Sequence, residues 1–571
     1  MKIEINNQSV NMPAGISILD ACKSANINIP TLCYLEDLFP SGSCRMCVVE
    51  IAGVKNLVTS CSTQITEGMK ISTHSNRVIA ARKSILELLL SNHPDDCLYC
   101  DKNNTCELQK LSAELGVRNR NFSKQLIEKE IDKSSPSLVR DPSKCILCGR
   151  CVRVCEERQT VSAISFIKRG SQTKVTTAFD GGLNTSNCIN CGQCAMVCPT
   201  GAIIEKNNIK DVLAALSDKN KVVVVQHAPA ISVTLGELFG FKPGTDVNGQ
   251  MTAALRKMGF QFVFETSFSA DVTIMEEASE LVDRIKKGEK LPLMTSCSPG
   301  WIKFVEHFYP EFLTNLSSCK SPQQMMGALI KNYWAFKKNI NPRNIYSVSI
   351  MPCTAKKFEA GREEMVTGGL ADIDAVLTTR ELAKMIDMFN INLAKLKPEN
   401  ADDPLGEHSS AAKLFGVTGG VAEAALRTAA FLITNDDSKV HEIREYRDLE
   451  GIKELTLNIN GITLKTVVVS GLSNARIVLD DIKRGLKQYH FIEVMTCPGG
   501  CIAGGGQPFG LDKDKIVARM KALYQIDKNE KIRKSHHNKD VVKLYEEFLM
   551  HPLSQKSHEL LHTKYKLRTG Y

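Results

Sequence analysis

The sequence predicts a multidomain α+β and α/β protein, in which small cysteine-rich units precede a larger α/β region. Its 571 residues are too many for a single hydrophobic core. It contains 21 cysteines, and all but five of them lie before residue 200. From about residue 210 onward, apolar strand patterns alternate with amphipathic helix patterns, which is typical of parallel α/β sheets.

The composition is that of an ordinary globular protein, with 43% hydrophobic and 24% charged residues. No apolar run approaches the roughly 18 residues that a membrane span needs. The first residues, MKIEINNQSV, alternate like a strand and contain no apolar export region. We therefore expect a cytoplasmic protein without a membrane partner. An odd number of cysteines in a reducing compartment favours metal or redox chemistry over disulfides.

The net charge of +9 reflects a mild excess of 72 basic over 63 acidic residues. It is consistent with solvated surfaces that bind nothing, or with a local basic patch that docks a small acidic electron carrier. We expect no nucleic-acid partner.

Residues 1–76 are expected to form a small β-rich unit. KIEINNQSVNM predicts two short strands around a turn, and Ser17 is the expected N-cap of a helix in which Cys22 is a buried core residue. Four cysteines suited to converge on iron follow in loops: Cys33, Cys44, Cys47 and Cys61. The stretch resembles a plant-type ferredoxin domain of the β-grasp fold, although its cysteine spacing is wider. The resemblance implies a 2Fe–2S cluster, and structural zinc is the alternative.

Residues 77–125 are expected to form a second unit, with a helix over 76–92. The potential ligands in HPDDCLYCDKNNTC are His93, Cys97, Cys100 and Cys106. One histidine and three cysteines at this spacing suit zinc and a 4Fe–4S cluster equally. Their place between two iron–sulfur motifs favours a His-ligated 4Fe–4S cluster. The polar stretch 121–143 then predicts a linker.

Residues 136–206 contain two copies of the motif C-x2-C-x2-C-x3-C, an internal repeat typical of bacterial two-cluster ferredoxins. In that pattern the fourth cysteine of each copy binds the cluster of the other copy. One 4Fe–4S cluster is therefore assigned to Cys145, Cys148, Cys151 and Cys198. The other is assigned to Cys155, Cys188, Cys191 and Cys194.

The region 210–525 places cysteines in contexts typical of a ligand site. SIMPCTAKKFE puts Cys353 at the carboxyl end of a buried strand, where open α/β sheets bind their ligands. EVMTCPGGCIAGGGQP puts Cys497 and Cys501 four residues apart, before glycines that let the backbone approach a bulky ligand closely. Lys356 is either a surface lysine or the partner of an anionic ligand of a metal centre.

Three motifs of this region, TSCSPGW, MPCTAKKFE and EVMTCPGGCIAGGGQP, resemble those of the iron-only hydrogenases. The N-terminal units resemble those of the long clostridial-type members, so that the resemblance covers nearly the whole chain. It implies a two-lobed α/β catalytic domain over 210–525 and a small-subunit-like helical tail over 526–571. It also implies an active-site cluster, in which a 4Fe–4S cubane is bridged by a cysteine thiolate to a diiron unit with carbon monoxide, cyanide and dithiolate ligands.

The same resemblance implies a role for each residue around that cluster. Cys353, Cys497 and Cys501 would hold the cubane, and Cys501 would make the bridge. Lys356 would hydrogen-bond a cyanide. The diiron pocket would be lined by Gln323, Met351, Phe415 and Met495.

The implied reaction is the reversible reduction of protons to dihydrogen by a monomer, with ferredoxin as electron partner and maturation proteins that supply the diiron unit. Protons need a relay of their own. Glu277 and Glu280 lie on one helical face, with Arg284 four residues after Glu280, a pattern that is usually only solvated. The resemblance places these residues and Ser317 on a proton path. A buried carboxyl with a raised pKa can take and release protons near neutrality.

The sequence departs from the family pattern at one position within TSCSPGW. The family has two adjacent cysteines there, of which the first carries protons and the second is the fourth cubane ligand; here the second is Ser298. Either Cys297 remains the proton carrier and Ser298 faces the cubane, or Cys297 becomes the ligand and Ser298 takes the proton task. Neighbouring side chains in an extended segment point in opposite directions, and the shared PGW anchors the register. We therefore expect Cys297 to remain the carrier.

Two alternative functions stay open at this point. One is a hydrogen-sensing or catalytically impaired relative, although no appended sensory domain is recognisable. The other is a diiron-free scaffold for iron–sulfur assembly. The complete glycine-rich motif and Lys356 argue against the scaffold, because a scaffold does not need a cyanide-binding lysine.

Overall fold

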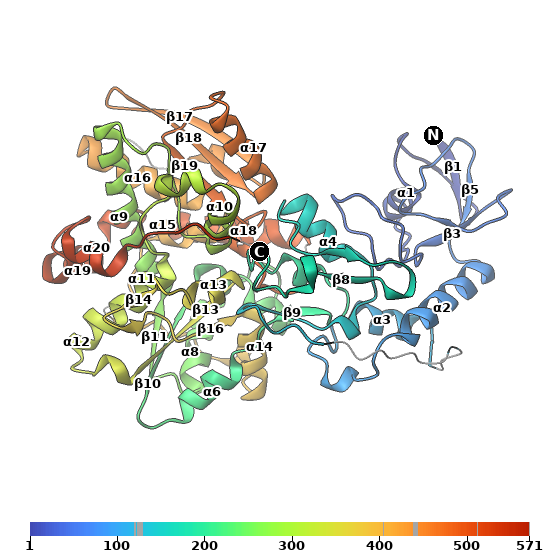
Figure 1. Ribbon diagram of the computed structural model, residues 1–571, viewed down its shortest axis with the longest axis horizontal. Helices are drawn as coiled ribbons and strands as arrows, with labels where there is room; N and C mark the ends of the chain where they lie inside the picture. Colours follow the sequence, from blue (N-terminus) through green and yellow to red (C-terminus); the bar gives the residue numbers. More distant parts are fainter. Residues whose placement is uncertain (119–121, 123–129, 404, 438–442, 511, 570–571) are drawn as a thin grey trace.

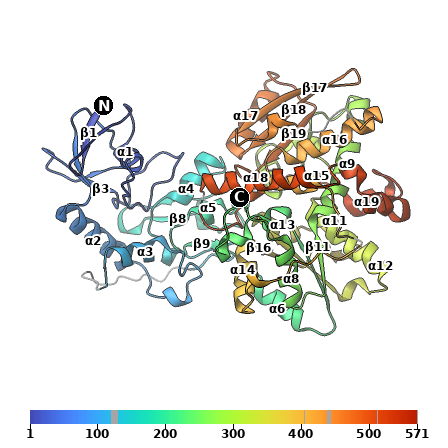
Figure 2. The same ribbon diagram turned by 180° about the vertical axis from the view of Figure 1, so that it is seen from behind.

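The computed structural model describes residues 1–118, 122, 130–403, 405–437, 443–510 and 512–569. Of the expected linker over 121–143, residues 121 and 123–129 lie outside the described part of the chain. The expectation of a linker is wrong for residues 130–143, because Leu138–Arg140 form a strand that pairs with Ile203–Glu205 of the third unit. The β-rich N-terminal unit lies at one end of the molecule and the α/β region at the other, with the two-cluster unit between them (Figures 1 and 2). Within the described part of the chain, no helix is long and apolar enough to cross a membrane.

The N-terminal unit is a five-stranded mixed sheet with the strand order β2-β1-β5-β3-β4. Its strands are β1 (Lys2–Ile5), β2 (Gln8–Asn11), β3 (Val48–Ile51), β4 (Val58–Thr59) and β5 (Lys70–Ser72). The hairpin β1–β2 and the helix α1 (Ile18–Ser24) confirm the predicted elements. Ser17 caps α1, because its side chain accepts the N–H of Asp20, and Cys22 is a fully buried core residue as expected.

The second and third units are mostly loops joined by short elements. The helices are α2 (Asn76–Ser91), α3 (Glu107–Glu114), α4 (Arg150–Arg153) and α5 (Gln193–Val197), and the strands are β6 (Leu138–Arg140), β7 (Ser165–Ile167), β8 (Lys174–Thr176) and β9 (Ile203–Glu205). The repeat is visible in the backbone, because α4 and α5 each follow a left-handed glycine, Gly149 and Gly192, both with φ of 72°. Only glycine adopts that conformation without strain, so the two copies turn in the same way.

The first sheet of the α/β region is fully parallel, with the order β11-β10-β13-β16, as predicted. Its strands are β10 (Val222–His227), β11 (Phe262–Glu265), β13 (Ile345–Met351) and β16 (Ala375–Thr378), and β14 (Val366–Thr367) and β15 (Leu370–Ala371) form a small separate hairpin. Its flanking helices include α6 (Ile209–Ser217), α7 (Pro229–Ser232), α8 (Asn248–Lys257), α12 (Ala335–Lys337), α13 (Ala355–Ala360) and α14 (Thr379–Met388).

The second sheet has the order β12-β19-β18-β17 and is mixed. Its strands are β12 (Leu293–Met294), β17 (Ile452–Ile459), β18 (Ile462–Ser470) and β19 (Phe491–Met495). The expectation of parallel sheets is wrong for β17, which pairs antiparallel with β18. The two strands are joined by the turn Asn460-Gly461, with φ of 49° and 82°. A two-residue turn can only join antiparallel neighbours.

Helices of very different length lie between and beside the two sheets. They are α9 (Thr266–Lys287), α10 (Pro299–Phe308), α11 (Pro322–Leu329), α15 (Ser410–Lys413), α16 (Gly420–Thr434) and α17 (Leu472–Lys483), followed by the C-terminal helices α18 (Lys513–Asn529), α19 (Lys539–Leu544) and α20 (Gln555–Leu561). The longest, α9, is buried along most of its length, in contact with α11 and α16. It therefore runs through the interior of the α/β region.

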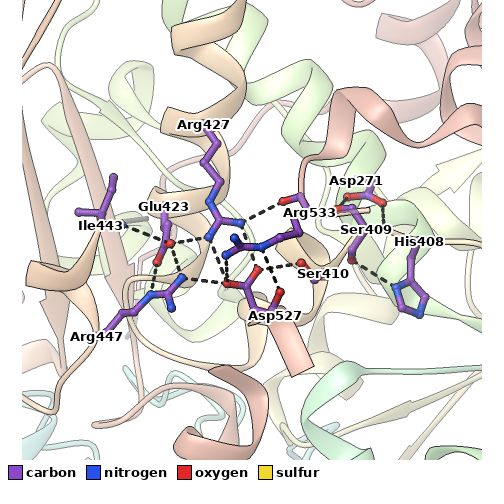
Figure 3. A network of polar contacts seen from close by, with 10 residues as sticks. All are labelled: Asp271, His408, Ser409, Ser410, Glu423, Arg427, Ile443, Arg447, Asp527 and Arg533. Atoms are coloured by element: carbon purple, nitrogen blue, oxygen red, sulfur yellow. Dashed lines mark hydrogen bonds and ion pairs between the residues drawn. The ribbon is translucent and has the colours of Figure 1, made fainter. Parts of the chain in front are cut away.

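A buried ion network fastens α18 to α16 (Figure 3). Arg427 donates to Glu423 at 2.6 Å and to Asp527 at 3.2 Å. Arg447 also donates to Asp527, at 2.8 Å. Buried charges are stable only when they are paired and hydrogen-bonded, so these contacts fix the position of α18 against α16.

Candidate functional site

The four cysteines of the first unit converge in the structure. Cys33, Cys44, Cys47 and Cys61 are all buried, and the Sγ atoms of Cys47 and Cys61 lie 3.4 Å apart. Hydrogen bonds from Cys44 and Cys61 hold the pKa of Cys33 well below its usual range. Four buried thiols in contact form a ligand set for a small iron–sulfur cluster.

Three of the four ligand candidates of the second unit line one opening. His93, Cys97 and Cys106 line the same cavity, and His93 Nδ1 lies 3.0 Å from the carbonyl oxygen of Pro94, a contact that orients the ring. Cys100 lies on the side of the two-cluster unit, because a Cβ on Gly201 would come within 2.9 Å of its Sγ atom. The second unit is thus in direct contact with the third.

The two-cluster unit groups its cysteines in the exchanged pattern. One cavity is lined by Cys145, Cys148, Cys151 and Cys198, the four residues assigned together from the spacing. The other four also lie together, since burial and then the charges of Cys191, Cys188 and Cys155 raise the pKa of Cys194 well above its usual value. Each copy of the motif therefore contributes its fourth cysteine to the group formed by the other copy.

A cavity of about 840 Å³ lies in the α/β region and gathers the candidate residues of that region. All ten candidates from its three motifs and its predicted pocket line this cavity: Cys297, Ser298, Gln323, Met351, Cys353, Lys356, Phe415, Met495, Cys497 and Cys501. Ala230, Ala355 and Thr496 line it as well.

The strands explain why distant cysteines meet. Cys353 follows the end of β13 by two residues, Cys497 follows the end of β19 by two, and Cys297 follows β12 by three. Each residue therefore projects from the carboxyl end of a strand in one of the two sheets, where α/β folds form their ligand sites. The cavity lies where these strand ends of the two sheets meet.

The three cysteines at the cavity fit an iron–sulfur cubane. Burial raises the pKa of the Cys501 thiol to about 12, and the charge of Cys353 adds to the effect. Burial and the charges of Cys353 and Cys501 likewise raise the pKa of Cys497 far above its usual value. Three buried thiolates need compensating positive charge, which cluster iron provides.

The glycines after Cys501 bring two parts of the backbone into contact. A Cβ on Gly504 would lie 2.2 Å from the carbonyl oxygen of Pro352, and one on Gly505 would lie 2.1 Å from that of Cys191. The expected close approach thus includes protein backbone, and the two-cluster unit forms part of the cavity wall through Cys191.

Lys356 is a buried lysine and not a surface one, with 8% of the residue exposed. Its ammonium group donates to Glu359 at 2.9 Å and to the carbonyl oxygen of Cys297 at 3.1 Å. Glu359 also accepts from Gln323 Nε2 at 3.1 Å and from the Ser321 hydroxyl at 2.8 Å. This network holds the charged end of Lys356 at the cavity wall.

Cys297 and Ser298 have different neighbours. The Oγ atom of Ser298 lies 2.8 Å from Thr496 Oγ1, directly before Cys497 in the chain. Burial raises the pKa of the Cys297 thiol well above its usual value, and the charges of Glu277 and Glu493 add to the effect. Ser298 therefore contacts the segment of the cubane cysteines, whereas Cys297 lies in the field of the buried carboxyls.

The candidate relay residues form a buried group beside the cavity. Arg284 Nη2 donates to Glu280 Oε1 at 2.6 Å, and the Ser317 hydroxyl donates to Glu280 Oε2 at 3.1 Å. Glu277 is 1% exposed, and neither of its carboxyl oxygens has a hydrogen-bond partner of normal geometry among the described residues. Burial and the charge of Glu280 raise the pKa of Glu277 to about 8. Acidic pairs at this spacing are usually solvated at the protein surface, but these two carboxyls are buried.

Three residues at the site were missed by the sequence reasoning. Gln193 Nε2 donates to Cys497 Sγ at 3.1 Å, across 304 residues of sequence. Glu493 is fully buried, accepts the N–H groups of Gly419 and Ala422 at 2.7 Å each, and has its pKa raised to about 7 by burial. The third is Glu359. A charged residue within a motif was a usable signal for Glu493 and Glu359, but no local pattern marks Gln193.

Five family models match the chain in consecutive segments. They are a 2Fe–2S iron–sulfur cluster binding domain over 1–76, the NADH-ubiquinone oxidoreductase-G iron–sulfur binding region over 82–121, a 4Fe–4S dicluster domain over 144–202, the C-terminal domain of the iron-only hydrogenase large subunit over 221–505, and the iron hydrogenase small subunit over 513–568.

Curated proteins and a solved structure give the same picture. The chain is 46% identical to the NADP-reducing hydrogenase subunit HndD of Solidesulfovibrio fructosivorans, covering 99% of this chain and 98% of that protein. It is 42% identical to iron hydrogenase 1 of Clostridium pasteurianum, covering 99% of each. A structure of apo [FeFe]-hydrogenase HydA1 from Chlamydomonas reinhardtii matches with a TM-score of 0.58 and 40% identity, over 63% of this chain and 99% of that one. With similarity along its full length, the chain belongs to the iron-only hydrogenases, and it has the long architecture in which iron–sulfur domains precede the catalytic domain.

Proposed function

We propose that the chain catalyses the reversible reduction of protons to dihydrogen at an active-site cluster held in the large cavity. One observation carries the proposal: Cys353, Cys497 and Cys501 meet there together with the buried ammonium group of Lys356. When bound, the cluster supplies the iron centre at which electrons and protons combine.

Each lining residue has a role that follows from its chemistry. Cys353, Cys497 and Cys501 would hold the cubane, and Cys501 would be the cysteine shared with the diiron unit. Lys356 presents a buried cation, which suits a hydrogen bond to an anionic ligand such as cyanide. Water is kept from the diiron side by the nonionic side chains of Gln323, Met351, Phe415 and Met495.

The chain has five domains, 1–76, 77–125, 136–206, 210–525 and 526–571, and electrons reach the active site through four accessory clusters in the first three of them. The order is one 2Fe–2S cluster on a β-grasp domain, a His-ligated 4Fe–4S cluster, and two 4Fe–4S clusters of a ferredoxin-like domain. The contact of Cys100 with Gly201 joins the second unit to the third, and that of Gln193 with Cys497 joins the third unit to the cavity. The first unit also contacts the third directly, because Arg153 donates to the carbonyl oxygen of Cys33. These contacts support a path that reaches the cavity through the third unit.

Protons follow a different set of residues. Cys297 exchanges a proton with Glu277, whose raised pKa keeps its carboxyl protonated at neutral pH. Ser317 donates to Glu280 and also lowers the pKa of Glu277, so it lies near both carboxyls and connects them once its hydroxyl turns, while Arg284 holds Glu280 in place. Ser298 faces the cubane beside Thr496 and takes no part in proton transfer.

The electron partner is a small acidic carrier such as ferredoxin, attracted by the net charge of +9. The chain acts as a monomer, and maturation proteins supply the diiron unit. Because the relative HndD is named a subunit of an NADP-reducing hydrogenase, turnover with reduced ferredoxin and with NADPH should be compared. Turnover with NADPH alone would contradict ferredoxin as the partner.

Infrared spectroscopy of the matured protein tests the function. Carbon monoxide and cyanide bands, together with dihydrogen evolution from a reduced dye, are expected from a hydrogenase. Bands with only very slow turnover would indicate a hydrogen sensor or an impaired relative. Absence of the bands in a protein with full cubane iron would indicate a diiron-free scaffold.

Replacing His93 with cysteine should keep the second cluster and lower its reduction potential, because an anionic thiolate replaces a neutral imidazole. Redox titration followed by electron paramagnetic resonance measures the change. His74→Asn is the control, since His74 lies in the neighbouring unit and bonds to Thr73. An unchanged potential, or zinc in place of iron in the wild type, would contradict the assignment.

A further inference from the structure

The C-terminal segment covers one side of α9 and organises a second buried carboxyl there, Glu276. This side chain is fully buried. It accepts hydrogen bonds from the Tyr545 hydroxyl at 2.6 Å, from the N–H of Leu553 at 2.8 Å and from the Ser557 hydroxyl. Its remaining contact is with His562 Nε2, at 3.1 Å. All four partners belong to the C-terminal segment, and the fourth partner is an imidazole.

The other nitrogen of His562 points toward the relay. His562 Nδ1 lies 2.8 Å from Ser318 Oγ. Ser318 contacts Glu280 Oε2 twice, through its hydroxyl at 3.3 Å and its N–H at 3.2 Å. An unbroken chain of hydrogen bonds thus runs from Glu276 through His562 and Ser318 to Glu280. Carboxylate, imidazole and hydroxyl in this order form an arrangement that transfers protons in many enzymes.

His562 is held by the backbone and not only by its ring. The N–H of Lys320 donates to the carbonyl oxygen of Leu561, and the N–H of Thr563 donates to that of Ser318, at 2.7 Å each. These bonds fix the segment on both sides of His562 whatever its side chain is. The backbone pairing alone is therefore sufficient to hold this segment in place. The two hydrogen bonds of the imidazole ring are not needed to hold the segment and are available for proton transfer.

His562 is itself buried, and the exposed residue beside it is His558. The ring of His562 contacts Glu276 of α9 and His558 of the tail, while Cys319 pairs with His562 through the backbone. Glu280 and Tyr545 lie one hydrogen bond further away, beyond Ser318 and Glu276 respectively. His558 is exposed, and its ring centroid lies 4.2 Å from that of His562. His558 also lines an opening together with Glu280, Arg284 and Ser318.

We propose that His562 is a proton-transfer residue that connects solvent with Glu280, and that Glu276 is its positioning residue. The proposal rests on the proposed role of Glu280 in the relay. Burial alone would raise the pKa of Glu276. Hydrogen bonds from His562, Ser557 and Tyr545 outweigh this effect and hold the pKa below its usual value. The ionised carboxylate keeps one ring proton on Nε2 and stabilises the imidazolium.

One proton enters and one leaves in each transfer. The imidazolium gives its Nδ1 proton to Ser318 Oγ while the hydroxyl proton of Ser318 passes to Glu280. His562 is then neutral, with its proton on Nε2 toward Glu276. After the Ser318 hydroxyl turns, His562 takes the next proton from His558, which lines the opening and lies against its ring. The reverse sequence releases protons during dihydrogen oxidation.

The test uses the matured full-length enzyme with His562 replaced by alanine. Dihydrogen evolution should fall by about 10²-fold, with unchanged carbon monoxide and cyanide bands, and added imidazole should restore part of it. Ser318→Ala should be slowed as strongly but should gain nothing from imidazole, because the gap then lies between the ring and Glu280. His551→Ala is the matched control, since His551 is an exposed histidine of the same tail.

Three outcomes would overturn the proposal. Wild-type turnover in both His562→Ala and Ser318→Ala is one. Slow turnover in His562→Ala without imidazole rescue, together with a lowered midpoint of thermal unfolding, is the second and shows a structural role. The third is slow turnover in Glu280→Gln together with normal turnover in His562→Ala. That result would keep Glu280 as a relay residue and would exclude His562 from the relay. Wild-type turnover in Glu280→Gln would instead overturn the relay itself.

Discussion

Replacing Glu277 with glutamine lowers dihydrogen evolution by about 10²- to 10⁴-fold, while the infrared bands of the matured enzyme stay unchanged. The amide has the size of the carboxyl but cannot pass a proton between Cys297 and Ser317. The effect is large because the side chain is 1% exposed, so that solvent offers no substitute carrier at this point. Turnover with a reduced dye, measured beside the infrared spectrum, separates proton delivery from cluster assembly.

The same residue sets a dependence on pH. Its pKa of about 8 lies above the ordinary glutamate value of about 4.3, so that Glu277 is protonated at neutral pH and loses its proton as the pH rises through about 8. Evolution by the wild type should fall through that range, and the glutamine variant should lack this inflection. Asp283→Asn is the control on the same helix, since Asp283 pairs with Lys287 at the surface. Wild-type turnover in Glu277→Gln would remove Glu277 from the relay.

Replacing Cys297 with alanine lowers turnover by a similar factor of about 10²- to 10⁴-fold and leaves the cubane assembled. The thiol lies in the field of Glu277 and Glu493, whereas Ser298 contacts Thr496 beside Cys497. Proton delivery therefore depends on Cys297 and cubane assembly does not. Iron counting and electron paramagnetic resonance measure the cubane, and dye-driven evolution measures turnover.

Ser298→Cys is the matched variant for this experiment. It places a thiol where the family has its fourth cubane ligand, so we expect a lower cubane potential and retained turnover. If the cubane is lost in Cys297→Ala and is kept in Ser298→Cys, Cys297 is the ligand in the natural chain and the assigned register is wrong.

Much of the architecture could be predicted because its causes are local. The strand pattern before MPC predicted a buried strand, and β13 ends two residues before Cys353. The spacing within each cysteine run predicted which thiols gather, and Cys198 lies with Cys145 as expected. Short spacings of this kind fix geometry within one or two turns of backbone, so the sequence alone is sufficient.

Other features depend on contacts that no local pattern encodes. The burial of Lys356 follows from Glu359 and from the wall around it, and an isolated lysine is usually exposed. The contact of Gln193 with Cys497 joins residues 304 apart. The strand β17 runs against its neighbour because of one tight turn, although its apolar residues fit either direction. Tertiary packing determines the burial of Lys356, the contact of Gln193 and the direction of β17. The sequence is compatible with each of these features but does not predict it.

The close approach of Gly505 to the carbonyl oxygen of Cys191 constrains how this protein can evolve. Any side chain at position 505 would meet the carbonyl oxygen of Cys191 at 2.1 Å. Glycine is therefore required there as long as the two-cluster unit packs against the cavity in this way. The β-rich N-terminal unit lines no part of that cavity and contacts the two-cluster unit instead, where Arg153 donates to the carbonyl oxygen of Cys33. Lineages of this protein that keep the two-cluster unit should thus keep the matching glycine, whether or not they keep the outer unit.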